Sequence, residues 1–85
     1  MVKIIKKWYG KNNISIAIEK ETGRNLAHVQ IYKSKHRTNT EIPGSYTDLS
    51  PKDLAVAMNL YHKNKLEIEH IRNNIISGKY DFYLK

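Results

Sequence analysis

The sequence contains no cysteine among its 85 residues, and only two prolines, one tryptophan and one phenylalanine. Without cysteine, neither a disulfide nor a thiolate metal site can hold the fold together, so side-chain packing must stabilise it. Apolar runs are also short, and none approaches the roughly 20 residues needed to span a bilayer. The first residues, MVKIIKKWYG, lack the apolar stretch of a signal peptide. We therefore expect a cytoplasmic protein with no membrane partner.

Common catalytic and metal-binding signatures are missing too. The sequence has no Gly-rich loop of the kind that cradles phosphates, and neither Ser34 nor Ser45 lies in a recognisable nucleophile context. His62 and His70 lie two helical turns apart, whereas helical zinc motifs place their histidines at i and i+4. The sequence therefore predicts neither a metal site nor a cofactor.

The chain is short and its charge is unevenly placed. A chain of 85 residues forms a single domain, here residues 1–85, and buries only roughly 60–65% of the surface of its unfolded form. Its formal net charge is +7, and residues 1–37 hold nine Lys or Arg against two Glu, while the remainder is balanced. A basic half of this kind attracts polyanions. The alternative is that a Lys-, Ile- and Asn-rich composition reflects only an AT-rich genome.

The amino-terminal half has the pattern of a β-sheet. Residues 2–9 (VKIIKKWY), 14–19 (ISIAIE) and 26–32 (LAHVQIY) are rich in strand formers, and a shorter strand is expected at 38–42. The second stretch alternates Ile with Ser, Ala and Glu, which is typical of a half-buried strand. Short polar turns separate these stretches, so we expect an antiparallel meander of three to four strands.

The carboxyl-terminal half has the pattern of a helix. Ser50 is a good N-cap, Pro51 suits the first helical position, and apolar residues then recur at three- and four-residue spacing from Leu54 to Ile75. One helix over 51–77 would be about 40 Å long, and Asn64 and Lys65 weaken its apolar stripe, so a bend or break at 62–66 stays open. The predicted fold class is α+β, a two-layer sandwich with the sheet packed on a long or broken helix.

The candidate site follows from the third strand and the loop after it. If Val29 and Ile31 point inward, alternation points His28, Gln30 and Tyr32 outward together. Aromatic rings can stack on bases, basic groups can neutralise phosphates, and the imidazole and amide can bond a base edge or ribose hydroxyl. The predicted binding residues are Lys3, Lys7, Tyr9, His28, Gln30, Tyr32, Lys33, Lys35, His36 and Arg37. The expected partner is a nucleic acid, or an acidic or nucleoprotein surface. A plain solvated surface is the remaining alternative.

Two further features leave alternatives open. His28 could act as a general acid or base on RNA, because histidine titrates near neutral pH. The aromatic segment YDFYL at residues 80–84 either caps a small core or forms a patch for homodimerisation.

Two stretches, ISIAIEKETGRNLAHVQIY and LYHKNKLEIEHI, resemble a small bacterial family of unknown function that is encoded beside antitoxin-like proteins. Members of that family have a strand with a His-x-His frame, another strand and a helix. Here His28-Val29-Gln30 keeps one of the two histidines, and the His-rich turn before that strand is missing.

Two other segments, AHVQIY and TEIPGSYTDLSPKDLAVAM, are similar to the HicA-like toxins that cleave messenger RNA. This resemblance implies a double-stranded-RNA-binding-like fold and an essential histidine on a strand. His28 is the one residue here that the motif matches. The amino-terminal helix of those toxins has no counterpart here, and Ala27 replaces the glycine before the histidine.

The residues together favour a non-enzymatic binding module of bacterial, phage or mobile-element origin that contacts nucleic acid or a nucleoprotein complex. A specific form of this prediction is an inhibitor of a host nuclease defence system. The alternative is a ribonuclease toxin that uses His28.

Overall fold

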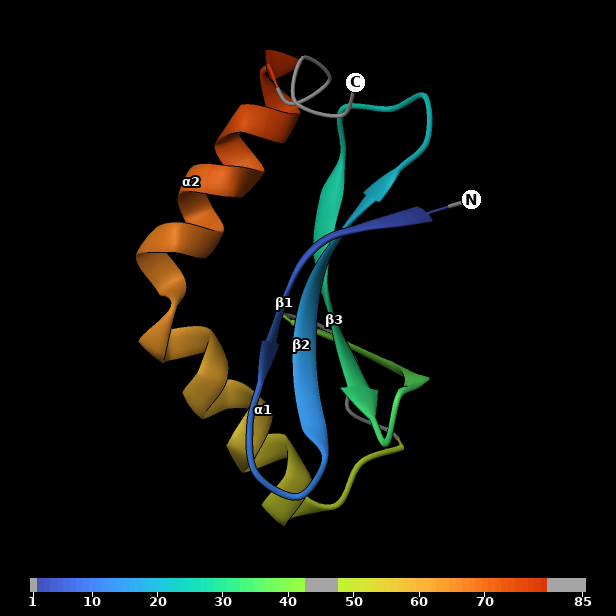
Figure 1. Cartoon of the computed structure of the whole chain (residues 1–85), viewed down its shortest axis with the longest axis vertical. Coiled ribbons are helices and arrows are strands. Elements are labelled where there is room, and N and C mark those ends of the chain that lie inside the picture. The colour runs from blue at the N-terminus through green and yellow to red at the C-terminus, as the bar shows by residue number, and fades with distance from the viewer. Residues whose placement is uncertain (1, 43–47, 80–85) are drawn as a thin grey trace.

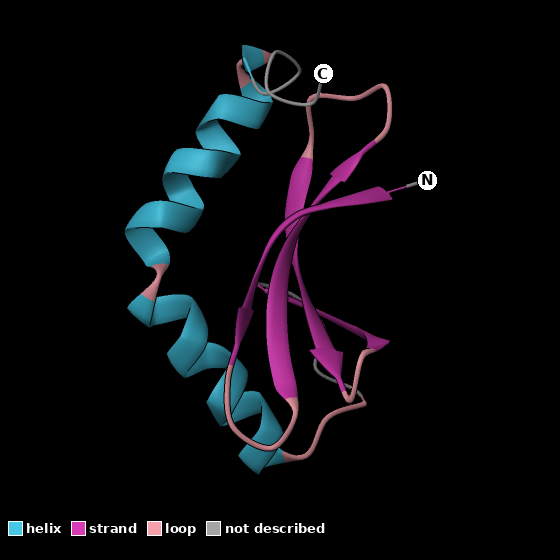
Figure 2. Ribbon diagram, viewed as in Figure 1, coloured by secondary structure: helices cyan, strands magenta, loops and turns pink. Residues whose placement is uncertain are grey.

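A computed structural model describes residues 2–42 and 48–79 and shows a four-stranded sheet covered on one face by two helices (Figures 1 and 2). The elements are β1 (Val2–Tyr9), β2 (Ile14–Glu21), β3 (Ala27–Lys33), β4 (His36–Ile42), α1 (Pro51–Lys63) and α2 (Lys65–Ile76). The predicted α+β class and two-layer arrangement are confirmed.

The sheet is an antiparallel meander in the order β1-β2-β3-β4, as the short turns predicted. Ser34 and Lys35 join β3 to β4 with φ values of +49° and +70°, the left-handed conformation that suits the twist of a two-residue hairpin. Asn12 and Asn13, in the turn between β1 and β2, also have positive φ. The Ser34 N–H donates to the Asn13 carbonyl at 2.9 Å, so the two turns meet at one end of the sheet.

The core lies between the sheet and the helices. Ile14, Ile16 and Ile18 of β2 are at most 1% exposed, and they belong to one apolar cluster with Val29, Ile31, Ala57, Ile68 and Ile75. Burying each isoleucine contributes roughly 1.5–3 kcal/mol, which is the main source of stability in a chain without disulfides. The isoleucines therefore face the helices, as the alternation in ISIAIE predicted. The prediction of a half-buried strand is wrong, because Ser15, Ala17 and Glu19 on the other face are at most 4% exposed.

The helical segment breaks at Asn64, within the range where the sequence left a bend open. The side-chain amide of Asn64 donates to the Leu60 carbonyl at 2.9 Å and so satisfies an acceptor in the last turn of α1. At the start of α1, Ser50 Oγ accepts from the Asp53 N–H at 3.2 Å, as expected for an N-cap. At the break the helical segment changes direction, so α1 and α2 form an arch over one face of the sheet (Figure 1).

Ion pairs connect the two layers at their edges. Glu67 of α2 accepts from the Lys6 ammonium and, at 3.2 Å, from Trp8 Nε1, and the Lys6 bond holds the pKa of Glu67 below its usual value. Lys33 of β3 donates to Asp53 of α1. These lysines are therefore engaged in holding helices onto the sheet.

Within residues 2–42 and 48–79, no helix has the length and apolarity required to cross a membrane. The aromatic segment at 80–84 lies outside the described residues, so the homodimer stays a prediction.

Candidate functional site

The sheet face opposite the helices, here called the outer face, brings together residues from all four strands. Cross-strand pairing places Lys7 beside Ala17, Ala17 beside Gln30, and Glu19 beside His28. Paired residues in a sheet point to the same side, so His28, Gln30 and Tyr32 do point away from the core, as predicted.

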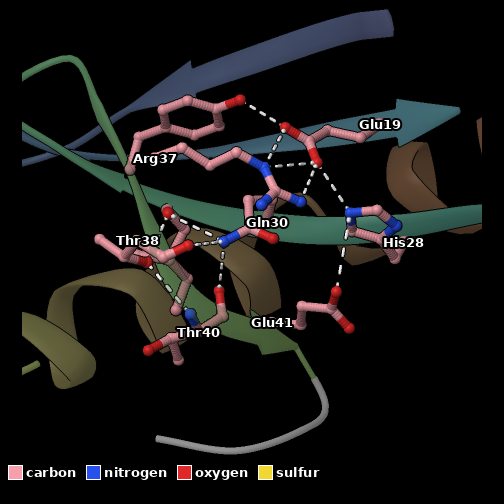
Figure 3. Close-up of polar contacts among 9 residues, drawn as sticks. Glu19, His28, Gln30, Arg37, Thr38, Thr40 and Glu41 are labelled. Atoms are coloured by element: carbon pink, nitrogen blue, oxygen red, sulfur yellow. Dashed lines mark hydrogen bonds and ion pairs between the residues drawn. The ribbon is translucent and has the colours of Figure 1, made fainter. Parts of the chain in front are cut away.

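A buried carboxylate organises the outer face. Glu19 is 0% exposed and accepts from His28 Nε2 at 2.7 Å, from Arg37 Nη2 at 3.0 Å and from the Tyr32 hydroxyl. We call these four residues the outer-face cluster. Figure 3 shows the His28 ring and the Arg37 guanidinium converging on the Glu19 carboxylate, with Glu41 at 3.8 Å from His28 Nε2.

The contacts within the cluster shift the pKa values of Glu19 and Tyr32. Burial by itself would raise the pKa of Glu19, but the bonds from Arg37, Tyr32 and His28 outweigh it and hold that pKa below its usual value. Burial and the neighbouring carboxylate raise the pKa of Tyr32 to about 12, so its hydroxyl keeps its proton. An ionised Glu19 can only accept, and His28 Nε2 must therefore carry hydrogen.

Nδ1 is the ring nitrogen of His28 that is left for contact with a ligand. No described residue bonds Nδ1, and the His28 side chain is 28% exposed. A neutral imidazole held by a carboxylate on one nitrogen, with a lone pair on the other, is a common arrangement for general-base catalysis. The candidate catalytic atom is therefore Nδ1, with Glu19 in a positioning role.

The expectation that Gln30 presents its amide to a ligand is wrong. Gln30 is 1% exposed, and its Nε2 donates to the carbonyls of Thr38 at 2.6 Å and Thr40 at 3.0 Å. The register of β3 and β4 shifts between Gln30 and Tyr32, and this irregularity frees those carbonyls to accept from the amide. Gln30 therefore has a structural role, because its amide satisfies backbone carbonyls of β4 where the strand pairing is irregular.

Tyr32 is also less open than the sequence indicated. It is 7% exposed, its hydroxyl is bonded to Glu19, and the Lys7 ammonium lies 4.2 Å from its ring centroid. A base cannot stack on a ring that a lysine already covers. Tyr9, by contrast, is 76% exposed.

The predicted binding residues do not share one surface. Lys33 pairs with core residue Ile14, and His36 pairs with Lys33, so both lie on the helix side of the sheet. Lys3 pairs with Lys20, which is two residues from Ile18 and faces the same side of β2. Lys3 therefore lies on the helix side as well. The expected single surface is therefore wrong, because the predicted residues divide between the two sides of the sheet. Lys3, Lys33 and His36 lie on the helix side, Lys7, Tyr9, His28 and Arg37 lie on the outer face, and Lys35 lies in the turn between β3 and β4.

Two cavities flank the end of the sheet where the turns meet. One, of about 360 Å³, includes Lys7 and Lys35 in its lining, and the other, of about 280 Å³, includes Lys11 and Lys63. Tyr9 and Gly10 line both cavities, and no Asp or Glu among the described residues lines either. We call Lys7, Tyr9, Lys11, Lys35 and Lys63 the hairpin end.

Sequence reasoning missed three of the residues that matter here. Lys63 comes from α1, which only tertiary packing brings to the β1–β2 turn, so no local signal marks it. Lys11 lies in the polar turn after β1, where a lysine has no local sequence signal of a binding role. Glu19 did carry a signal, since it follows Ser15 and Ala17 on the face of β2 that turns away from the core.

No group of three His, Cys, Asp or Glu side chains within residues 2–42 and 48–79 is arranged to hold a metal ion. A scan against protein-family models gave no match, and searches of curated proteins and of solved structures gave none either. Both family resemblances therefore stay predictions, and the function must be argued from the site itself.

Proposed function

We propose that this protein binds nucleic acid and that the hairpin end is its main contact. The observation that supports this most directly is the composition of the two cavities, with four lysines around one exposed tyrosine and no carboxylate from the described residues. Local positive potential of this kind attracts phosphates and accelerates association.

The charges of these lysines are available to a ligand. Lys6 and Lys33 are paired with Glu67 and Asp53, but no described carboxylate forms an ion pair with a lysine of the hairpin end. Lys7 instead lies over the rings of Tyr9 and Tyr32, at 5.7 Å and 4.2 Å from their centroids. A phosphate that approaches these ammonium groups therefore does not have to displace an acidic partner.

The outer-face cluster adds less net charge than the sequence suggested. Arg37 is bonded to Glu19, and Glu41 lies close to His28, so anionic groups offset the basic ones. The proposed interface is for this reason centred on the hairpin end, with the outer face beside it.

The test is binding of a labelled oligonucleotide as a function of salt. Affinity should fall steeply with salt, and the double variant Lys7→Gln/Lys35→Gln should bind more weakly, with the slope of log affinity against log salt reduced by about 1.4 for a single strand. The matched control, Lys65→Gln/Lys79→Gln, removes the same charge from exposed positions away from the hairpin end and should change the affinity much less.

Two results would contradict the proposal. One is the absence of binding at 50 mM salt, which would direct attention to an acidic protein partner. The other is an equal loss of affinity in both double variants, which would mean that only net charge matters.

The contact between Glu19 and His28 favours a second candidate function, cleavage of RNA. In this reaction His28 Nδ1 takes the proton from a ribose 2′-hydroxyl while the 2′ oxygen bonds to the adjacent phosphorus. The bond from phosphorus to the 5′ oxygen breaks, water protonates that oxygen, and His28 returns its proton to water. Arg37, whose guanidinium bonds the same Glu19 oxygen as His28, would offset charge on the phosphate.

Product analysis tests this second candidate. It predicts a 2′,3′-cyclic phosphate from RNA, no cleavage of DNA of the same sequence, and loss of cleavage in His28→Ala with oligonucleotide binding retained. It also predicts growth arrest on expression that His28→Ala abolishes. Cleavage by His28→Ala at the wild-type rate, or cleavage of DNA, would refute a role for this histidine.

A further inference from the structure

The most exposed aromatic ring near the basic cavities is Tyr9, the last residue of β1. Its side chain is 76% exposed, although β1 pairs with β2 up to this point through Tyr9 and Ser15. Because Tyr9 lines both cavities, its ring borders a pair of lysines in each, Lys7 with Lys35 and Lys11 with Lys63. One aromatic ring next to two basic cavities matches the repeating unit of a nucleic-acid strand, a base with a phosphate on either side.

The backbone that carries Tyr9 is held in place. The Gly10 N–H donates to the Ile14 carbonyl at 2.8 Å, which closes the β1–β2 turn. A Cβ at Gly10 would lie 2.8 Å from Leu60 Cδ1, so the turn packs against α1 without space for a larger residue. A ring on a fixed turn loses little further entropy when a ligand binds it.

Lys7 also restricts the Tyr9 ring. Its ammonium lies 5.7 Å from the Tyr9 centroid and 4.2 Å from the Tyr32 centroid. Contacts of this kind are favourable and place a cation beside the ring. With Tyr9 so largely exposed, enough of the ring stays open for a planar group to stack.

We propose that the hairpin end binds a single-stranded segment, with one base stacked on Tyr9 and the flanking phosphates in the two cavities. This inference rests on the proposed function and adds the substrate class. A base inside a duplex is already stacked on both sides, so the ring of Tyr9 reaches it only after it has been unstacked. The preference for single strands comes from this cost, because the lysines would attract either form.

The experiment compares a 12-nucleotide single-stranded RNA with a fully paired RNA duplex of the same length, by fluorescence anisotropy at 50 mM salt. Tyr9→Ala should weaken binding of the single strand by about 5- to 150-fold, the range expected when stacking on one aromatic ring is lost. Binding of the duplex should change by less than about twofold. Tyr9→Phe retains the ring and should bind the single strand nearly as well as the wild type does.

Leu26→Ala is the matched control, because Leu26 is an apolar residue that is 55% exposed and lies between β2 and β3, at the opposite end of the sheet from the β1–β2 turn. It should bind both probes as the wild type does. If the wild type binds neither probe, the proposed function itself fails. If it binds both equally, or if Tyr9→Ala binds the single strand at full affinity, the single-strand inference fails while electrostatic binding stands.

Discussion

Replacing Glu19 by glutamine should destabilise the protein more than any other single charge removal that we propose. The substitution keeps the size of the side chain but removes the negative charge that accepts from His28, Tyr32 and Arg37. One member of a buried ion pair typically costs about 3–5 kcal/mol to remove, because the other charge is left uncompensated. The Arg37 side chain is 46% exposed and can turn to water, so we expect a smaller loss of about 2–3 kcal/mol.

This loss is large for so small a chain. At roughly 0.05–0.15 kcal/mol per residue, domains of this size have a free energy of unfolding of only about 4–13 kcal/mol. The pKa of Glu19 is lowered in the folded state, so its contribution is present above the usual value of 4.5 and is lost as pH falls through the folded pKa. The difference between wild type and Glu19→Gln should therefore shrink in acid.

Urea denaturation at pH 7 and again below pH 4 measures both effects. The control is Glu41→Gln, because Glu41 is 49% exposed and lies 3.8 Å from His28, so its removal should cost less than about 0.5 kcal/mol. Equal stabilities of wild type and Glu19→Gln at pH 7 would refute the reasoning. A deficit that is as large in acid as at neutral pH would show that charge is not its cause.

Substitutions at three further positions test the fold around the site. Ile16→Ala removes a fully buried side chain and should lower the free energy of unfolding by about 2–5 kcal/mol, measured in urea; a loss below 1 kcal/mol would contradict its place in the core. Ser50→Ala removes the acceptor for the Asp53 N–H and should cost about 0.5–2 kcal/mol, whereas Ser50→Asp, which retains an acceptor, should not. Gly10→Val would overlap Leu60 and Val56 and should cost about 1–3 kcal/mol by thermal denaturation, and unchanged stability would show that the turn does not pack on α1.

Local sequence signals predicted most of the fold. Alternating isoleucines marked β2, the Ser50-Pro51 start marked α1, and the polar pair Asn64-Lys65 marked the helix break. Each of these signals depends on residues close in sequence, which is why single-sequence reasoning could use them. The first strand has the expected bounds, whereas the other three differ from the expected ranges by one or two residues, mainly because pairing continues into the turns.

The site was harder to predict because it depends on which side of the sheet each residue faces. Lys33 is two residues from Ile31 and faces the same side of β3, so the alternation that buries Ile31 also directs Lys33 toward Asp53 of α1. The shift in register beside Gln30 and the arrival of Lys63 from α1 have no local sequence signal. Irregular pairing and long-range packing therefore limited the prediction of the site more than that of the fold.

Mapping the amide signals of the ¹⁵N-labelled protein during titration with a single-stranded oligonucleotide tests the proposed interface most directly. We predict that the largest shifts fall in the two turns, at Gly10–Asn13 and Ser34–Lys35, and near Lys63, and that they disappear at high salt. Signals of α2 should stay in place. Shifts concentrated on α2, or an unchanged spectrum at low salt, would contradict nucleic-acid binding at the hairpin end.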